Sequence, residues 1–239
     1  MVNISIIARR ELDSFFLSPV SYVVLTAFAL AHGLIFSVFL GGQQIDSGMV
    51  ATRTLWLTLY LLIPAVPVLT MRLMSREFGQ RTIENLLTAP VTDGQVVAGK
   101  YMGALLFTLA MLAPLWLEIA YLEAVTDLDW GRMMAAFMGL FLVICQFLAV
   151  GLLCSTLTRM QFASAILSFA ALLGLFFAWF LTGGSQSQAA SVLRYLSPLN
   201  HFRSFGNGVI DSRDLVYYVA STALLLYVTV PVAEFKRWR

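Results

Sequence analysis

The segment Gly94-Gln-Val-Val-Ala-Gly99-Lys100 has the residue types and spacing of a loop that binds nucleotide phosphates. In such a loop, backbone N–H groups and the lysine hold the phosphates, and a following Ser or Thr binds Mg²⁺. Tyr101 occupies that position here, and the segment leads into a long apolar stretch with no preceding strand. We therefore expect no nucleotide site. Gly99 and Gly103 instead form a small-xxx-small pattern, which lets two helices approach closely.

Two polar side chains interrupt the apolar stretches and are candidates for a pathway or for helix packing. Glu118 follows Lys100 by 18 residues, about 27 Å along a helix. We therefore expect a solvated carboxylate near the membrane edge, with a functional intramembrane acid as the alternative. Gln146 could line a pathway or hydrogen-bond between helices, and the second role is the more common.

Residues capable of catalysis or metal binding do not form a recognisable pattern. His32 and His201 lie on different segments without matching ligands, so we expect no metal site. Cys145 and Cys154 are nine residues apart on one predicted helix and face opposite ways, which excludes a disulfide between them. No serine, cysteine or carboxylate constellation appears at a catalytic spacing. We expect a protein that is not catalytic by itself and that carries no cofactor.

The composition indicates that lipid surrounds most of the chain. Apolar residues make up 59% of the 239 residues and charged residues 12%, against about 25% charged in ordinary soluble domains. Six stretches reach the length of about 20 residues that a membrane-spanning helix needs. The sequence therefore predicts an all-α integral membrane protein with one domain over residues 1–239. Its spans lie near 19–40, 53–74, 98–122, 131–156, 162–182 and 214–233.

The basic residues predict the orientation of these spans. With both termini in the cytoplasm, ten of the fifteen basic residues fall on the cytoplasmic side, as the positive-inside rule requires. The net charge of +2 therefore reports topology, and we expect no nucleic-acid partner. Ala29-Leu30-Ala31 imitates a signal-peptide cleavage site, but the apolar run continues to Leu40. We expect an uncleaved first span.

Segments outside the spans also have helical patterns. Residues 1–18 include an amphipathic helix expected to lie in the membrane interface. Between the second and third spans, residues 75–97 form a charged loop with a short amphipathic helix, for which Ser75 is a candidate N-cap. Thr92 and Gln95 then form a capping box for the third span. Residues 183–213 have the composition of short helices at the outer interface.

The charged loop carries a family resemblance. Its stretch Arg81-Thr-Ile-Glu-Asn-Leu-Leu-Thr-Ala-Pro-Val-Thr92 resembles the coupling helix of the membrane subunits of type-2 ABC transporters, in which Thr-Ile-Glu-x-Leu-Leu is usual and Gly is commoner at the position of Arg81. The segments Leu196-Ser-Pro-Leu-Asn-His-Phe202 and Gly208-Val-Ile-Asp-Ser-Arg-Asp214 resemble the gliding-motility-type branch of this permease class. The resemblance covers essentially the whole chain.

This resemblance implies an ATP-driven exporter subunit in the bacterial inner membrane. A separate cytoplasmic ABC ATPase, in two copies, would supply the energy, and a second permease copy or paralogue would complete the pathway. We expect the ATPase to contact Arg76, Glu77, Arg81, Thr82, Glu84 and Asn85, while Phe78, Ile83, Leu86 and Leu87 anchor the coupling helix. The alternative is a non-transporting membrane scaffold that recruits a cytoplasmic partner through the same helix.

Overall fold

The computed structural model describes residues 2–41, 47–80, 92–181 and 188–237, and these form helices joined by short connections. The helices are α1 (Val2–Phe16), α2 (Pro19–Leu40), α3 (Ser47–Thr70), α4 (Ser75–Gln80), α6 (Asp93–Met111), α7 (Ala113–Val125), α8 (Trp130–Leu157), α9 (Gln161–Leu181), α10 (Gln188–Leu196), α11 (Pro198–Gly206) and α12 (Ser212–Arg237). No strand occurs within these ranges, so the expected all-α fold is confirmed.

Six segments are long and apolar enough to cross a membrane, as predicted. The third of them consists of two helices, because α6 ends at Met111 and α7 begins at Ala113. Pro114 lies in the first turn of α7, where its missing N–H costs nothing. This break allows the second half of the span to pack at its own angle.

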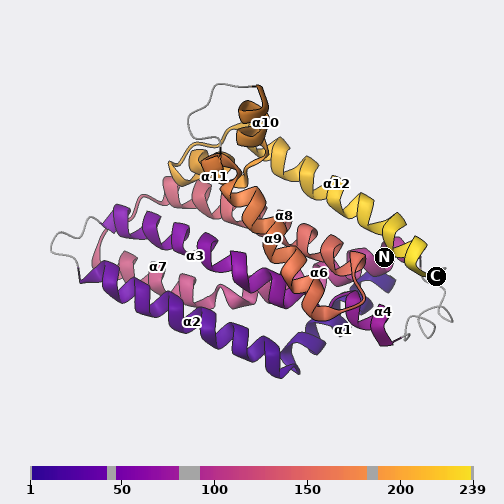
Figure 1. The fold of residues 1–239 in the computed structure, drawn as a ribbon. Coiled ribbons are helices and arrows are strands. Elements are labelled where there is room, and N and C mark those ends of the chain that lie inside the picture. Colours follow the sequence, from indigo (N-terminus) through magenta and orange to yellow (C-terminus); the bar gives the residue numbers. More distant parts are fainter. Residues whose placement is uncertain (1, 42–46, 81–91, 182–187, 238–239) are drawn as a thin grey trace.

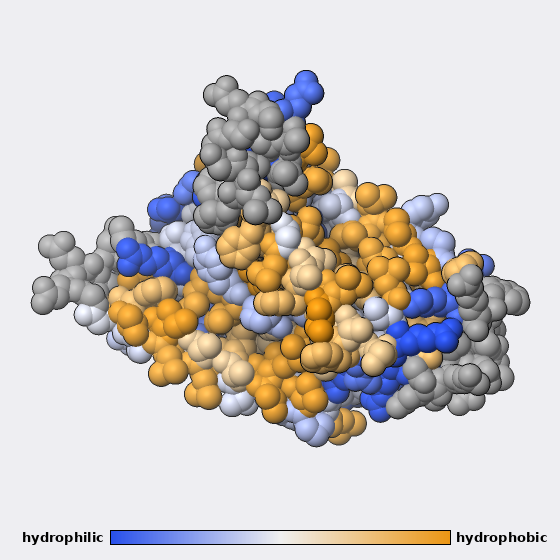
Figure 2. Space-filling view, viewed as in Figure 1, coloured by the Kyte–Doolittle hydropathy of each residue, from blue (hydrophilic) through white to orange (hydrophobic). Residues whose placement is uncertain are grey.

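The spans are not equally enclosed. In the most apolar window of α8, 67% of the residues are buried, against 17% in the corresponding windows of α2 and α12. Figure 1 shows α2 and α12 along two outer edges of the bundle, with α9 in front of α8 between them. Hydrophobic side chains cover the middle of the face drawn in Figure 2, and hydrophilic ones gather toward the ends of the molecule. An apolar surface of this kind suits lipid.

Small residues bring the inner helices into close contact. Gly151 of α8 lies directly against the Thr70 side chain of α3, where a Cβ would have no room. Gly139 of α8 packs in the same way against Phe205 of α11. Without a hydrophobic force between helices in lipid, such close packing is a main source of association.

The helix over residues 1–18 is also present as predicted. α1 is separated from α2 by Leu17 and Ser18, because Pro19 disfavours a helical conformation for the residue before it. α1 packs against α6 through Phe15, whose ring stacks on Phe107 with centroids 4.9 Å apart. The start of α1 and the end of α12 lie at the same end of the molecule (Figure 1). The short helices expected within residues 183–213 are α10 and α11, at the opposite end.

Candidate functional site

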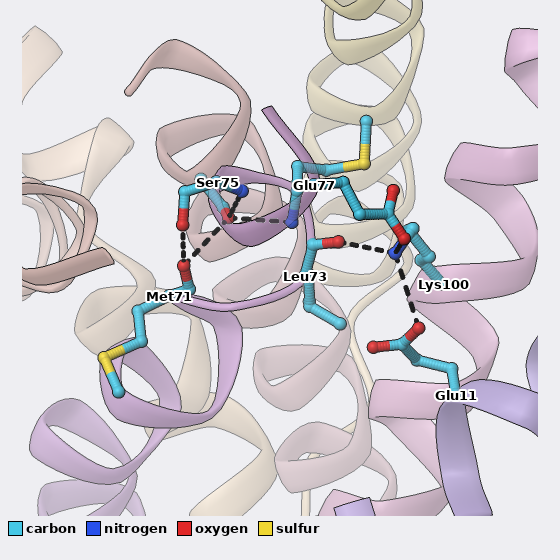
Figure 3. A network of polar contacts seen from close by, with 8 residues as sticks. Glu11, Met71, Leu73, Ser75, Glu77 and Lys100 are labelled. Atoms are coloured by element: carbon cyan, nitrogen blue, oxygen red, sulfur yellow. Dashed lines mark hydrogen bonds and ion pairs between the residues drawn. The ribbon is translucent and has the colours of Figure 1, made fainter. Parts of the chain in front are cut away.

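Lys100 of α6 is a buried cation that joins three helices near the two chain ends. Its Nζ donates to Oε1 of Glu77 at 2.7 Å and to the backbone carbonyl of Leu73 at 2.6 Å. It also forms an ion pair with Oε2 of Glu11, on α1, at 3.4 Å. The Lys100 side chain is 4% exposed and each carboxylate side chain 20%. Figure 3 shows the ammonium group between the three acceptors.

The local sequence explains why Lys100 lies at this depth. Thr92 and Gln95 form the predicted capping box, which starts α6 at Asp93 and places Lys100 two turns later. On the face toward α1, a Cβ on Gly99 would lie 2.7 Å from Cβ of Ile7, and one on Gly103 would lie 2.7 Å from Cβ of Glu11. The two glycines therefore admit α1, which carries Glu11 to the lysine.

The other side of this site is a turn held by Ser155 of α8. The Ser155 hydroxyl accepts hydrogen bonds from the backbone N–H groups of Met74, at 3.1 Å, and Ser75, at 3.2 Å. It donates to the carbonyl of Met71 at 3.3 Å. These bonds satisfy backbone groups between α3 and α4, part of which Figure 3 shows. The turn fixes the Leu73 carbonyl that faces Lys100.

Ser75 does not have the predicted N-cap role. It is the first residue of α4, and its hydroxyl donates to the carbonyl of Met71 one turn earlier. The backbone that enters α4 is instead satisfied by Ser155, which lies 80 residues away in the sequence. Local spacing could not reveal this partner.

Three of the predicted coupling residues lie on α4. Arg76 is exposed, whereas Glu77 is directed inward to Lys100. Phe78 is buried, with Nζ of Lys236 5.5 Å from its ring centroid. The remaining predicted contacts (Arg81, Thr82, Glu84 and Asn85) and anchors (Ile83, Leu86 and Leu87) lie outside the described residues.

The site has the chemistry of a structural and mechanical junction. The Lys100 ammonium group donates to a carbonyl and two carboxylates, so none of its N–H donors remains for a phosphate. Burying a cation is tolerable only when it is paired and hydrogen-bonded. The arrangement therefore locks α1, α4 and α6 to one another, and a force on α4 would reach all three.

The expectation of a solvated Glu118 is wrong. Glu118 is 8% exposed, and its Oε2 lies 2.7 Å from Nδ1 of His32 on α2. The other ring nitrogen of His32 lies 2.8 Å from Oγ1 of Thr58 on α3. Because α7 packs against α2 and α3, position along the chain alone misjudged the surroundings of this carboxylate. In the sequence, the available signal for this contact was the presence of two polar residues, His32 and Glu118, within apolar runs.

Gln146 takes the second of its two expected arrangements. Its Nε2 donates to Oη of Tyr217 at 3.1 Å and to Oγ of Ser221 at 2.9 Å, both on α12. The amide therefore joins the buried helix α8 to the peripheral helix α12. Such bonds between spanning helices contribute about 1 kcal/mol.

A polar cluster that the sequence did not predict lies at the opposite end of the bundle. Nδ1 of His201 lies 2.6 Å from Oδ1 of Asp214, and Nε2 lies 2.8 Å from the carbonyl of Tyr195. The imidazole stacks on Tyr217 with centroids 3.9 Å apart. With both nitrogens occupied, His201 ties α10 and α11 to α12. Within the described ranges, no three His, Cys, Asp or Glu side chains group as metal ligands.

Comparison with protein-family models identifies a match over most of the chain. A family model described as "ABC-2 family transporter protein" matches residues 6–234. A search of curated proteins finds no match. The matched range includes α4, Lys100, the first five candidate spans and all but the last two residues of the sixth.

Proposed function

The chain belongs to the ABC-2 family of transporter proteins, and from that premise we propose that it is the permease subunit of an ATP-driven exporter. It is a multi-pass membrane protein and the membrane component of an ABC transporter, a class that works with a cytoplasmic ABC ATPase. In our proposal the complex contains two ATPase subunits and a second permease copy or paralogue. The chain lies in the bacterial inner membrane with both termini in the cytoplasm and belongs to the gliding-motility-type branch.

The observation that supports this proposal is the ion pair between Glu77 and Lys100. The segment between α4 and α6 follows Gln80, the last residue of α4, and precedes Asp93, the first residue of α6. Lys100 belongs to α6, after the segment, and its Nζ contacts Leu73 and Glu77, before it, so α4 and α6 meet at one buried group. A push on the segment would therefore move α4, α6 and α1 together.

We propose that the ATPase contacts the exposed Arg76 and, in the segment itself, Arg81, Thr82, Glu84 and Asn85. Phe78, buried on α4, acts with Ile83, Leu86 and Leu87 as the anchor. Glu77 contacts the ATPase only when its ion pair with Lys100 breaks and a residue of the ATPase takes the place of the lysine. Such an exchange supplies the different contacts in two states that any ligand-driven switch requires.

The experiment that tests this function uses the full chain from native membranes in mild detergent. We expect an ATPase with a phosphate-binding loop to co-purify, and its ATP hydrolysis in lipid nanodiscs to depend on this chain. The double variant Glu77→Arg/Glu84→Arg should reduce ATP hydrolysis at least tenfold, because charge reversal turns attraction into repulsion within the contact.

Asp127→Arg provides the matched control. Asp127 is exposed between α7 and α8, at the end of the molecule away from α4. This variant should insert normally and keep full ATPase coupling. Equal coupling in the double variant and the control would refute the proposed contact, and transport by the chain without any ATPase would refute the function.

A further inference from the structure

A groove lined by arginines lies where α1 meets α2. It has a volume of about 820 Å³. Four arginine guanidinium groups and one carboxylate, that of Asp13, line it, so the lining has a net charge of +3. The arginines are Arg9, Arg10, Arg72 and Arg76. We propose that this groove binds the phosphate headgroup of an anionic phospholipid.

The arginines have few partners inside the chain. Among the described residues, Arg9, Arg10 and Arg76 form no ion pair within 4 Å, and all three side chains are exposed. An exposed cluster of like charges repels itself, and an anion relieves this repulsion. Guanidinium groups also match phosphate oxygens geometrically, because they present paired donors.

The base of the groove is held in place independently of any ligand. Arg72 donates through Nη1 to Oγ of Ser18 and through Nη2 to Oγ of Ser21, the latter at 3.0 Å. These bonds cross from the end of α3 to the start of α2. The site is therefore formed between three elements rather than by one mobile side chain.

Apolar side chains at the margin favour a lipid over a free phosphate. Ile6 and Leu17 line the groove and are 60% and 83% exposed. On α2, Val20 and Val23 continue the exposed apolar surface along a spanning helix, at 38% and 67% exposure. A phosphate held by the arginines would leave acyl chains free to run along this surface. The groove also lies at the first turn of a span, which is the depth of lipid headgroups.

The test measures the preference of the purified full chain for phosphatidylglycerol over phosphatidylcholine by native mass spectrometry in detergent. We expect phosphatidylglycerol to bind more tightly, and the variant Arg9→Gln/Arg10→Gln to lose about fivefold in preference for each arginine removed. Arg76 stays unchanged, because it belongs to the proposed ATPase contact. The matched control is Arg159→Gln/Arg213→Gln, which removes two exposed arginines outside the groove and should keep the preference.

Three outcomes would overturn the proposal. The first is an unchanged preference in the groove variant, or in Arg10→Gln alone if the double variant does not fold. The second is displacement of phosphatidylglycerol by millimolar inorganic phosphate, which would assign the groove to a free anion. The third is loss of ATPase co-purification in the groove variant while its lipid preference stays unchanged, which would assign the groove to protein docking. Because the groove variant spares the proposed coupling residues, normal ATPase coupling with lost lipid preference supports the lipid site alone.

Discussion

Nδ1 of His32 lies 2.7 Å from Oε2 of Glu118, which joins α2 to α7 within two candidate membrane spans. His32 is fully buried and Glu118 is 8% exposed. Polar groups at such depth are costly when alone, and the close approach of the imidazole and the carboxyl group offsets part of that cost. Since α2 is among the least enclosed spans, this contact is a polar link that helps to hold it to the bundle.

Removing both members of this pair should cost less than the two single removals added together. We expect His32→Leu and Glu118→Leu each to lower the free energy of unfolding, the former by about 3 kcal/mol because it leaves a buried carboxyl group without its partner. The double variant His32→Leu/Glu118→Leu should lose less free energy of unfolding than the two single losses added together, by about 1 kcal/mol or more. Thermal unfolding of the purified chain measures all three. Strict additivity of the two single effects would show that the contact contributes nothing to stability.

Lys100 permits the same kind of measurement at the end of the bundle where α1 begins and α12 ends. Lys100→Met leaves Glu11 and Glu77 without the cation, and we expect a loss of about 3 kcal/mol in the free energy of unfolding. Adding Glu77→Gln should restore part of that loss, because one uncompensated carboxylate disappears. Arg159→Met, at an exposed position, is the control and should be within about 0.5 kcal/mol of the original chain. A Lys100→Met protein as stable as this control would contradict the structural role of the ion pair.

Periodicity and apolar length were sufficient to predict the fold. The six spans, α1, and the capping box of Thr92 and Gln95 depend on residues close together in the sequence, where helix rules apply directly. The same holds for α10 and α11.

The partners of the polar side chains could not be predicted, because they depend on which helix faces which. Lys100 follows Glu77 by 23 residues and Glu11 by 89, and the sequence offered only a failed phosphate-loop pattern to draw attention to it. Glu118 was misjudged for the same reason, since its partner His32 lies on the first span. Gly99 and Gly103 were predicted to admit a helix, but the identity of that helix, α1, came only from the structure.

The contact between α1 and α6 depends on the absence of side chains at two positions. Gly99→Val would place new atoms against Ile7, where even a Cβ would lie 2.7 Å from two of its carbons. We expect a loss of about 1–3 kcal/mol in the free energy of unfolding, because α1 must move away. Gly174→Val is the control, since nothing lies within 4 Å of a Cβ on Gly174. Equal thermal unfolding temperatures for the two variants would show that α1 adapts without cost.

The proposed orientation can be tested with single cysteines at the two ends of the bundle. In a background with Cys145→Ala and Cys154→Ala, one protein carries Met160→Cys and the other Asp127→Cys. Met160 is 70% exposed between α8 and α9, at the end that holds the termini, and Asp127 is exposed at the opposite end. A membrane-impermeant maleimide applied to spheroplasts should label Asp127→Cys, and it should label Met160→Cys only after the membrane is permeabilised. The reverse pattern would place the segment between α4 and α6 outside the cell. No cytoplasmic ATPase could then reach Glu84, and the proposed coupling would fail even if the fold were unchanged.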